Sequence, residues 1–533
     1  MSRAETDRDG VRDFVWPVAR AEVVAVRDTT FKELVAAARR AGIGPGQDGE
    51  ILAVLIGWFL NEAMVGYSAY ALLRRLEAIG RRPIPVEGSR FLPAATQRKA
   101  PTWSPFLDII RRGPDRSKRW DWVPVRMRQS LRSARMRSLS WENLRPLDLS
   151  QDIVSIQRLP LIVRHAELVE ESVRYTNVGD WVLPIEGDHE VGGREGGQLL
   201  DDSLDAVRGG FAAGNESLPP FLEDFLRRWF ESGMGMTRAY LDEMTRRPQS
   251  LPRRLWTGSG GRIWGRMLRH ATRRVGGEVT GHDHAMGIGH LNYTVKMVTD
   301  FESCDTFVTF SEMQADSLRR TLRNDLLLLP KAPNIIALPE NDHASERPGR
   351  SAQSTRAGRT RPLRTVMYPS SFYRGEKVGY AVQMPDIVAL DWEARLFAHL
   401  SSWGYEVLHK PHPGSVSLPP AESVEAVGGR LITDRFENVS HLADAFIFID
   451  PQSTPFVLIM KSDKPVVFVD FGLYEWMPEA FELLERRCRV VKGLFDEKNR
   501  AQVDWDALRS AIEDAKDLSD HSFYDSYLMV SQE

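Results

Sequence analysis

The segment KPHP at residues 410–413 places a lysine and a histidine at the end of an apolar run that predicts a β-strand over residues 406–410. Its prolines lack backbone N–H donors and restrict the chain around His412, which fixes the direction of the imidazole. That ring can donate a hydrogen bond to a phosphate oxygen or to a sugar carboxylate. We therefore interpret Lys410, His412 and Pro413 as part of an anion-binding site. The alternative is a rigid turn in which the histidine caps a neighbouring carbonyl group.

Two other loops in the same half of the chain have residue types that bind phosphate. The segment QST at residues 452–454 stands where a predicted strand gives way to a helix, and a helix N-terminus offers free N–H groups and the positive end of a dipole. The segment PSS at residues 369–371 closes another predicted strand and has a cation close behind it. An ordinary helix cap and a Pro-Ser turn are the respective alternatives. The candidate donor-binding residues of these loops are Gln452, Ser453, Thr454, Ser370, Ser371 and Arg374.

Candidate catalytic side chains stand in the first half of the chain. The run GHDHAMG at residues 281–287 follows a predicted strand and precedes a glycine-rich helix start. Strand alternation places His282 and His284 on one face and Asp283 on the other. A metal site that adds His290 is not expected, because no known spacing places this third ligand.

A second candidate is the acidic loop EGDHE at residues 186–190, which also follows a predicted strand. Carboxylates at the edge of a cleft supply general bases or nucleophiles. Glu186, Asp188 and Asp283 therefore compete for one catalytic role. The alternative at residues 186–190 is a polar surface loop, because the continuation VGGREGG is rich in glycine.

The elements that must position these loops alternate between strands and helices, which is typical of an α/β fold with parallel sheets. Ligands of such sheets bind beyond the carboxyl ends of the strands, where the candidate loops fall. The first Rossmann-like domain is expected to begin with a strand at 51–59, a helix at 63–78 and a strand at 83–86. The full prediction is a helical extension at 1–49, a Rossmann-like acceptor domain at 50–340, a flexible linker at 341–361 and a Rossmann-like nucleotide-donor domain at 362–533.

Length and composition limit the class of protein. A chain of 533 residues is longer than one hydrophobic core normally supports, so more than one domain is expected. A composition of 42% apolar and 27% charged residues is ordinary for a globular protein. Cys304 and Cys488 are too few for a disulfide framework or a cysteine metal cluster. The first residues are polar, without the apolar core of a signal peptide, and no apolar run is expected to span a bilayer, the best being 51–60. We therefore expect a cytoplasmic protein.

The charge is unevenly spread along the chain. Between Arg98 and Arg137 there are twelve Lys or Arg against three Asp, interleaved with Trp103, Trp120 and Trp122, inside a predicted insertion at 98–150. One interpretation is a solvated basic helical insertion. The other is a surface that rests on anionic lipid, which would make the protein peripheral on the inner face of the plasma membrane. Binding to nucleic acid is not expected, because the net charge of the chain is −3 and no sequence motif of a nucleic-acid-binding domain accompanies the basic segment.

The second half of the chain resembles bacterial surface-polysaccharide transferases of the GT-B type, through KPHP, a strand ending at Asp450, then QST and KPVVFVDF. Within that assembly it is similar to the CMP-ulosonate transferases, which carry a His-Pro motif at the CMP site, and to the CDP-glycerol glycerophosphotransferases. The run GHDHAMGIGH, followed by DFESCDTFVTFSEM, is similar to a pattern of capsule and lipopolysaccharide transferases. The phosphotransferases have Asp-Tyr-Ser-Ser where this chain has Asp-Pro-Gln-Ser-Thr, so the ulosonate group is favoured.

The resemblance implies two Rossmann-like domains facing a cleft, with His412 and Pro413 at the nucleotide phosphate and Ser453 and Thr454 at a phosphate-binding helix start. It implies a glycosyltransferase that moves an ulosonic acid, Kdo or Kdn, from CMP to an oligosaccharide or lipid-linked acceptor of a cell-surface glycan. A retaining double displacement would use a carboxylate nucleophile. No cofactor is expected, and no divalent metal is required if protein donors stabilise the departing phosphate.

Two alternatives stay open at this point. One is a CDP-polyol phosphotransferase of the teichoic-acid type, in which His282 or His284 would match the second histidine of that family. The other is a non-catalytic scaffold that binds a nucleotide sugar within a polysaccharide assembly complex.

Overall fold

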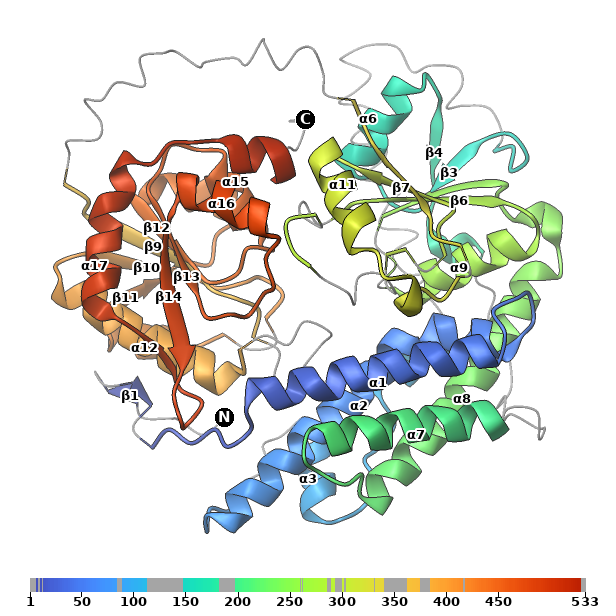
Figure 1. The fold of residues 1–533 in the computed structure, drawn as a ribbon, viewed down its shortest axis with the longest axis horizontal. Helices are drawn as coiled ribbons and strands as arrows, with labels where there is room; N and C mark the ends of the chain where they lie inside the picture. The colour runs from blue at the N-terminus through green and yellow to red at the C-terminus, as the bar shows by residue number, and fades with distance from the viewer. Residues whose placement is uncertain are drawn as a thin grey trace.

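The computed structural model is an α/β protein with two mostly parallel sheets, one of six strands and one of seven, beside a layer of long helices (Figure 1). The α/β class expected from the sequence is confirmed. The structure describes residues 6–7, 10–11, 13–83, 89–112, 147–181, 197–258, 260, 262–284, 289–292, 300–301, 303–329, 331–339, 362–373, 384–415 and 418–528.

The first sheet has parallel strands in the order β4-β3-β5-β6-β7-β8. The strands are β3 (Ile153–Ser155), β4 (Val173–Tyr175), β5 (Arg254–Thr257), β6 (Glu278–His282), β7 (Thr306–Thr309) and β8 (Asn334–Ala337). Alternation along the strands buries Leu255, Val279 and Phe307 in the largest core, whereas Trp256 faces the opposite side of the sheet. Because β4 and β5 lie on opposite sides of β3, the winding reverses there, and the crevice at the carboxyl ends of β3 and β5 is a switch point.

The second sheet has the order β11-β10-β9-β12-β13-β14-β15, and only its last pair, β14 and β15, is antiparallel. The strands are β9 (Thr365–Pro369), β10 (Glu406–Lys410), β11 (Gly429–Leu431), β12 (Ala445–Phe448), β13 (Val466–Asp470), β14 (Arg489–Phe495) and β15 (Ala501–Val503). The strand predicted at 406–410 is confirmed with these bounds. The central strands β9, β12 and β13 are buried along their whole length, because helices cover both faces of the sheet.

Further helices connect these strands. Those of the first sheet are α6 (Pro160–Leu168), α9 (Ile263–Arg274) and α11 (Glu312–Thr321). Those of the second are α12 (Asp386–Ser402), α13 (Ala421–Glu425), α14 (Phe436–Val439), α15 (Thr454–Met460), α16 (Pro478–Arg487) and α17 (Trp505–Asp514). The last described turn, Tyr524–Leu528, packs against α11 and α15.

The layer of long helices lies beside the first sheet (Figure 1) and shares its largest hydrophobic core. It consists of α1 (Arg20–Arg40), α2 (Asp48–Ala78), α3 (Phe91–Thr96), α4 (Pro105–Arg112), α7 (Gly197–Ala213) and α8 (Pro220–Thr245). Helix α2 is its centre, because α1, α3, α7, α8 and α9 all contact it.

The strand predicted at 51–59 is wrong, because these residues lie inside the 31-residue helix α2. Residues 51–57 are all buried, so apolar side chains occur on every side of the helix and leave no periodicity to read. A short apolar run of that kind cannot distinguish a strand from a buried helix. The helix predicted at 63–78 belongs to the same α2, and of the strand predicted at 83–86 only Pro83 is described, outside any strand.

The expectation that no segment could span a membrane is also wrong for α2. By length and composition this helix could cross a bilayer, although 83% of its most apolar window is buried inside the protein. A buried core helix passes the same test. The packing of α2 against five other helices accounts for its apolar composition.

Candidate functional site

The three predicted donor loops begin at one edge of the second sheet. Strands β10, β9 and β12 are direct neighbours, and all three point the same way. The backbone N–H of Ser370, just beyond β9, donates to the carbonyl of Lys410 at 2.9 Å. Since β10 and β12 lie on opposite sides of β9, this edge is also a switch point, the usual place for a ligand in an open α/β sheet.

His412 has its ring fixed by the loop that contains it. The backbone N–H of Gly414 donates to its Nδ1 at 3.0 Å, and the ring packs edge-on against Phe372 at a centroid distance of 5.1 Å. Because Nδ1 accepts a hydrogen bond, the proton of the neutral ring lies on Nε2. His412 is exposed, so its Nε2–H is a donor suited to an anion.

Lys410 ends β10 and is 6% exposed. Its Nζ donates to the carbonyl of the next residue, Pro411, at 2.9 Å. Burial lowers the pKa of Lys410, and the nearby carboxylates Glu437 and Asp434 act in the opposite direction. The ammonium group therefore stands behind the His412 loop, where it adds positive charge to that edge.

The loop before α15 is held together by internal hydrogen bonds. Ser453 caps the helix, because its Oγ accepts from the backbone N–H of Phe456 at 3.3 Å. Asp450 Oδ1 accepts from the N–H of Gln452 at 2.9 Å and from the hydroxyl of Tyr474 at 2.8 Å. The Ser453 hydroxyl thus does what an ordinary helix cap does, while the side chain of Thr454 is exposed.

Beneath the loop that contains Ser370 and Ser371 lies a buried polar cluster that sequence reasoning missed. The Tyr373 hydroxyl donates to the Glu393 carboxyl group and lies 3.5 Å from His409 Nε2. Burial raises the pKa of Glu393 to about 8 and lowers the pKa of His409 to about 3. The cluster anchors the loop after β9 to α12 and β10. Arg374 lies outside the described residues.

The first sheet places His282 in the interior rather than on a cleft wall. It ends β6, is 0% exposed, and its Nε2 lies 3.0 Å from Nδ1 of His165 in α6. The ring of His165 stacks on Trp256 at 4.2 Å. Burial, together with His165, lowers the pKa of His282 to about 3, and burial lowers the pKa of His165 as well. No sequence motif marks His165, which lies in helix α6, 117 residues before His282 in the chain.

Asp283 follows β6 and is 1% exposed. Its carboxyl group lies 3.5 Å from the amide nitrogen of Gln314, which also donates to the carbonyl of Tyr527 at 2.6 Å. His284 is half-buried and lies close to Gly258, where an added Cβ would come 3.3 Å from the His284 Cβ. The structure therefore places Asp283 and His284 at one sheet edge, whereas Glu186 and Asp188 lie outside the described residues.

The glycine turn after β5 is held at the switch point of the first sheet. The N–H of Gly258 donates to the side chain of Gln157, at the end of β3, over 2.6 Å. The carbonyl of Gly258 accepts from the buried Arg269 at 2.5 Å. A side chain at Gly258 would displace the side-chain ends of Leu159 and Gln157 and would therefore disturb the hydrogen bond from Gln157.

The edges of the two sheets contact each other through the loops beyond their carboxyl ends. The N–H of Met477 donates to the carbonyl of His290 at 3.0 Å, and the N–H of Asn292 donates to the carbonyl of Glu475 at 2.8 Å. Residues 289–292 follow β6, and residues 475–477 follow β13. The loop that follows β6 in the first sheet and the loop that follows β13 in the second sheet therefore contact each other.

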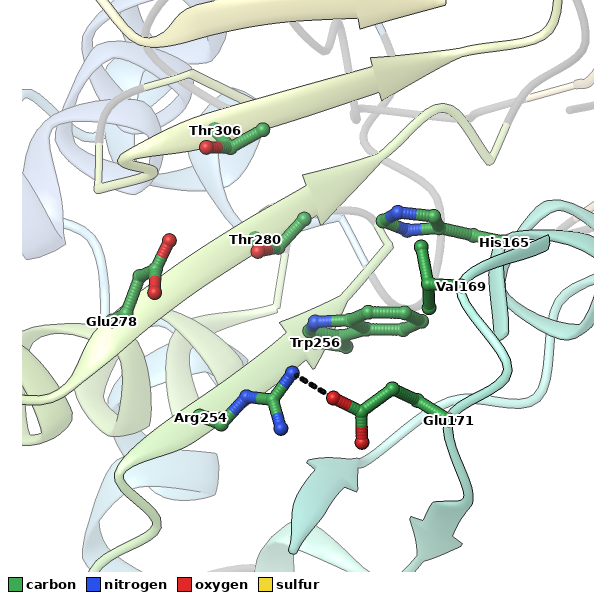
Figure 2. Close-up of a pocket in the computed structure, with 8 residues that line it drawn as sticks. All are labelled: His165, Val169, Glu171, Arg254, Trp256, Glu278, Thr280 and Thr306. Atoms are coloured by element: carbon green, nitrogen blue, oxygen red, sulfur yellow. Dashed lines mark hydrogen bonds and ion pairs between the residues drawn. The ribbon is translucent and has the colours of Figure 1, made fainter. Parts of the chain in front are cut away.

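A separate cavity of about 220 Å³ lies over one face of the first sheet rather than at its carboxyl edge (Figure 2). It is lined by His165, Val169, Glu171, Arg254, Trp256, Glu278, Thr280 and Thr306. Arg254 and Glu171 form an ion pair at 2.9 Å on its rim.

Among the described residues no group of three or more His, Cys, Asp or Glu side chains could hold a metal ion.

Comparison with models of known protein families gives no match, and comparison with curated proteins gives none either.

Proposed function

We propose that this chain is a nucleotide-sugar-dependent glycosyltransferase of the GT-B arrangement. The observation that supports the proposal is the contact between residues 289–292 and 475–477, which joins loops beyond the carboxyl edges of the two parallel sheets, one after β6 and one after β13. Each of these edges contains a switch point, so one can hold the donor nucleotide and the other the acceptor. In this proposal the second sheet binds the donor, because its edge carries the exposed His412 and the buried Lys410.

The proposed donor is a CMP-activated ulosonic acid such as Kdo or Kdn. Such a donor has a phosphate diester and a sugar carboxylate, two anionic groups close together. The His412 Nε2–H and the charge of Lys410 offer a donor and a cation at one edge, which supports this choice. The same groups would stabilise the CMP leaving group, so no divalent metal is assigned a role.

The proposed chemistry is a double displacement. A carboxylate attacks the anomeric carbon of the ulosonic acid, and the bond to CMP breaks with its electron pair on the phosphate oxygen. An acceptor hydroxyl then attacks the same carbon, loses its proton to a base and releases the carboxylate. Asp283 can take the first role only if the contact of Gln314 with Tyr527 opens, since the aspartate is buried. Glu186 and Asp188 remain the other candidates.

The burial of His282 bears on the alternative, a CDP-polyol phosphotransferase. That reaction needs an imidazole in contact with the substrate, whereas His282 is fully buried and bonded to His165. His284 is then the histidine that this alternative would have to use. Trapping a covalent sugar adduct would exclude phosphotransfer, and turnover of CMP-Kdo with an oligosaccharide acceptor would exclude a non-catalytic scaffold.

The deciding experiment is a thermal-shift panel with CMP, CDP, UDP and GDP. A ligand that binds only the native state at about 100 times its Kd stabilises it by about 2.7 kcal/mol, so CMP should raise the melting temperature by several degrees. His412→Ala should remove most of that increase, and His441→Ala, a change at an exposed histidine in the turn Ser440–Leu442 before β12, should leave it intact. Equal shifts for all four nucleotides, or none, would contradict a CMP-specific site.

A further inference from the structure

The cavity over the first sheet is formed where α6 approaches β5, β6 and β7 (Figure 2). It is smaller than the roughly 300–1,000 Å³ of pockets for drug-sized ligands. Its volume of about 220 Å³ suits a single small ring or a short polyol. No residue of the proposed donor site lines it, so it is a second, independent candidate for ligand binding.

The hydrogen bonds behind the cavity determine which nitrogen of His165 carries its proton. The carbonyl of Thr257 can only accept, so His282, whose Nδ1 lies 3.2 Å away, has its proton on Nδ1. His282 Nε2 is then an acceptor, and His165 Nδ1 donates to it across 3.0 Å. Both rings are buried, which lowers their pKa values and keeps them neutral. The remaining nitrogen of His165, Nε2, is therefore a hydrogen-bond acceptor.

The other polar groups of the cavity also suit hydroxyls. Thr280 and Thr306 offer one hydroxyl each from neighbouring strands, and Glu278 at the start of β6 offers a carboxylate (Figure 2). A sugar hydroxyl can donate to His165 or to a carboxylate and can exchange hydrogen bonds with a threonine. The lining is therefore rich in acceptors.

The charges of the lining argue against an anionic ligand. Glu171 and Glu278 oppose the single cation Arg254, which is already paired with Glu171 at 2.9 Å. A phosphate or a sugar acid would face uncompensated negative charge, so Coulomb repulsion would add to the cost of removing the anion from water. A neutral molecule with several hydroxyls meets no such cost.

We propose that this cavity binds one neutral polyhydroxylated unit, of the size of a single sugar ring, through a hydroxyl that donates to His165 Nε2. The site is distinct from the proposed CMP site and does not depend on it. His165, which lines the cavity, is hydrogen-bonded to His282, and His282 is the residue before Asp283. A sugar bound to His165 would therefore be connected through these two imidazoles to the carboxyl edge of β6.

The test is ligand-observed NMR on the full chain with glycerol, D-glucose, N-acetyl-D-glucosamine and myo-inositol, each titrated to 50 mM. We expect millimolar binding of at least one of them, with a change in the ¹⁵N shift of His165 Nε2. Thr306→Val and Thr280→Val each remove one hydroxyl with little change of shape, and each should weaken binding about fivefold, the loss expected for one uncharged hydrogen bond. Thr96→Val, at an exposed threonine in α3, is the matched control and should bind as the wild type.

Three results would overturn the proposal. They are the absence of binding by all four probes at 50 mM, unchanged binding by both threonine variants, and displacement of the probe by inorganic phosphate or CMP. Unchanged melting temperatures would show that the variants are folded. Because CMP is expected not to compete, a negative result here would leave the donor proposal untouched, and failure of the nucleotide panel would leave this site untouched.

Discussion

At the scale of single residues, the least expected feature is a carboxyl group under the candidate donor loop. Glu393 is 3% exposed and bonded to Tyr373, and burial raises the pKa of Glu393 to about 8. At neutral pH this group is therefore protonated in the folded protein, whereas it is ionised in the unfolded chain. It can act as a neutral hydrogen-bonding partner that holds the loop after β9 in place.

Glu393 makes stability depend on pH in a specific direction. The pKa of Glu393 is about 4.5 in the unfolded chain and about 8 in the folded protein, so between these pH values only the folded protein keeps the proton. The contribution of Glu393 to the free energy of unfolding is therefore fully present below pH 4.5 and is lost as the pH rises to 8. The total change is on the order of 5 kcal/mol. Urea unfolding at pH 5, 6, 7 and 8 should show this decline in wild type and a smaller one in Glu393→Gln. Glu406→Gln, at an exposed carboxylate on β10, should keep the wild-type slope, and a steeper slope in Glu393→Gln would contradict the assignment.

At the scale of secondary-structure elements, α15 depends on one buried arginine. Arg487 in α16 is 0% exposed and donates to the carbonyls of Ile459, Met460 and Lys464 at 3.2, 3.3 and 2.9 Å. Two of these bonds reach carbonyls in the last turn of α15, and the third reaches the turn that leads into β13. The guanidinium therefore fixes the helix whose other end carries Ser453 and Thr454.

Replacing this guanidinium should be costly. Arg487→Met keeps the apolar stem but removes several buried hydrogen bonds from a charged donor, which should lower the free energy of unfolding by about 2–4 kcal/mol. Arg486→Met changes the exposed neighbour and should cost less than about 0.5 kcal/mol. Urea denaturation of both variants measures the difference. Equal stabilities would mean that water replaces the guanidinium.

Helix α4 and the residues before it present an exposed basic and apolar surface. Trp103 and Ile109 are 41% and 46% exposed, and Arg98, Lys99 and Arg111 are exposed beside them in the chain. Such a combination is typical of segments that rest on anionic lipid. The rest of the predicted membrane surface, residues 113–137, lies outside the described residues.

We expect the protein to co-sediment with vesicles that contain phosphatidylserine and less with pure phosphatidylcholine vesicles. Trp103→Ala combined with Ile109→Ser should reduce the bound fraction severalfold, because each removes apolar area from the contact. Ile79→Ser, at another exposed apolar residue, is the control. Loss of the same size in the control, or no dependence on lipid charge, would favour a solvated insertion.

At the scale of the whole molecule, both ends of the chain connect the two sheets. The N-terminal β1 (Thr6–Asp7) and β2 (Gly10–Val11) pack against α12 of the second sheet, where Val11 donates to the buried Asp391 at 3.0 Å. The turn Tyr524–Leu528 returns to the first sheet and contacts Gln314 in α11. Opening between the sheets must therefore break the contact of Gln314 with Tyr527.

Gln314→Leu tests that connection. The variant removes the donor to the Tyr527 carbonyl and should speed hydrogen exchange at residues 524–528 about tenfold or more, since the buried carbonyl loses its partner. It should also expose Asp283 to solvent, because the Gln314 amide covers that carboxylate. Gln198→Leu, at an exposed glutamine in α7, should leave exchange at 524–528 unchanged. Slower exchange in Gln314→Leu would refute the role of this contact.

The local sequence determined the strand at residues 406–410 and the breaker that ends it, because apolar runs and Pro breakers act over a few residues, but it gave no prediction for β14 or β15. It misassigned residues 51–59, since a helix buried on all sides has no periodic face. The tertiary structure alone decided that His282 pairs with His165, that Glu393 is bonded to Tyr373, and that the loops after β6 and β13 contact each other. Each of these contacts joins segments far apart in the chain, so no spacing within the sequence could reveal them.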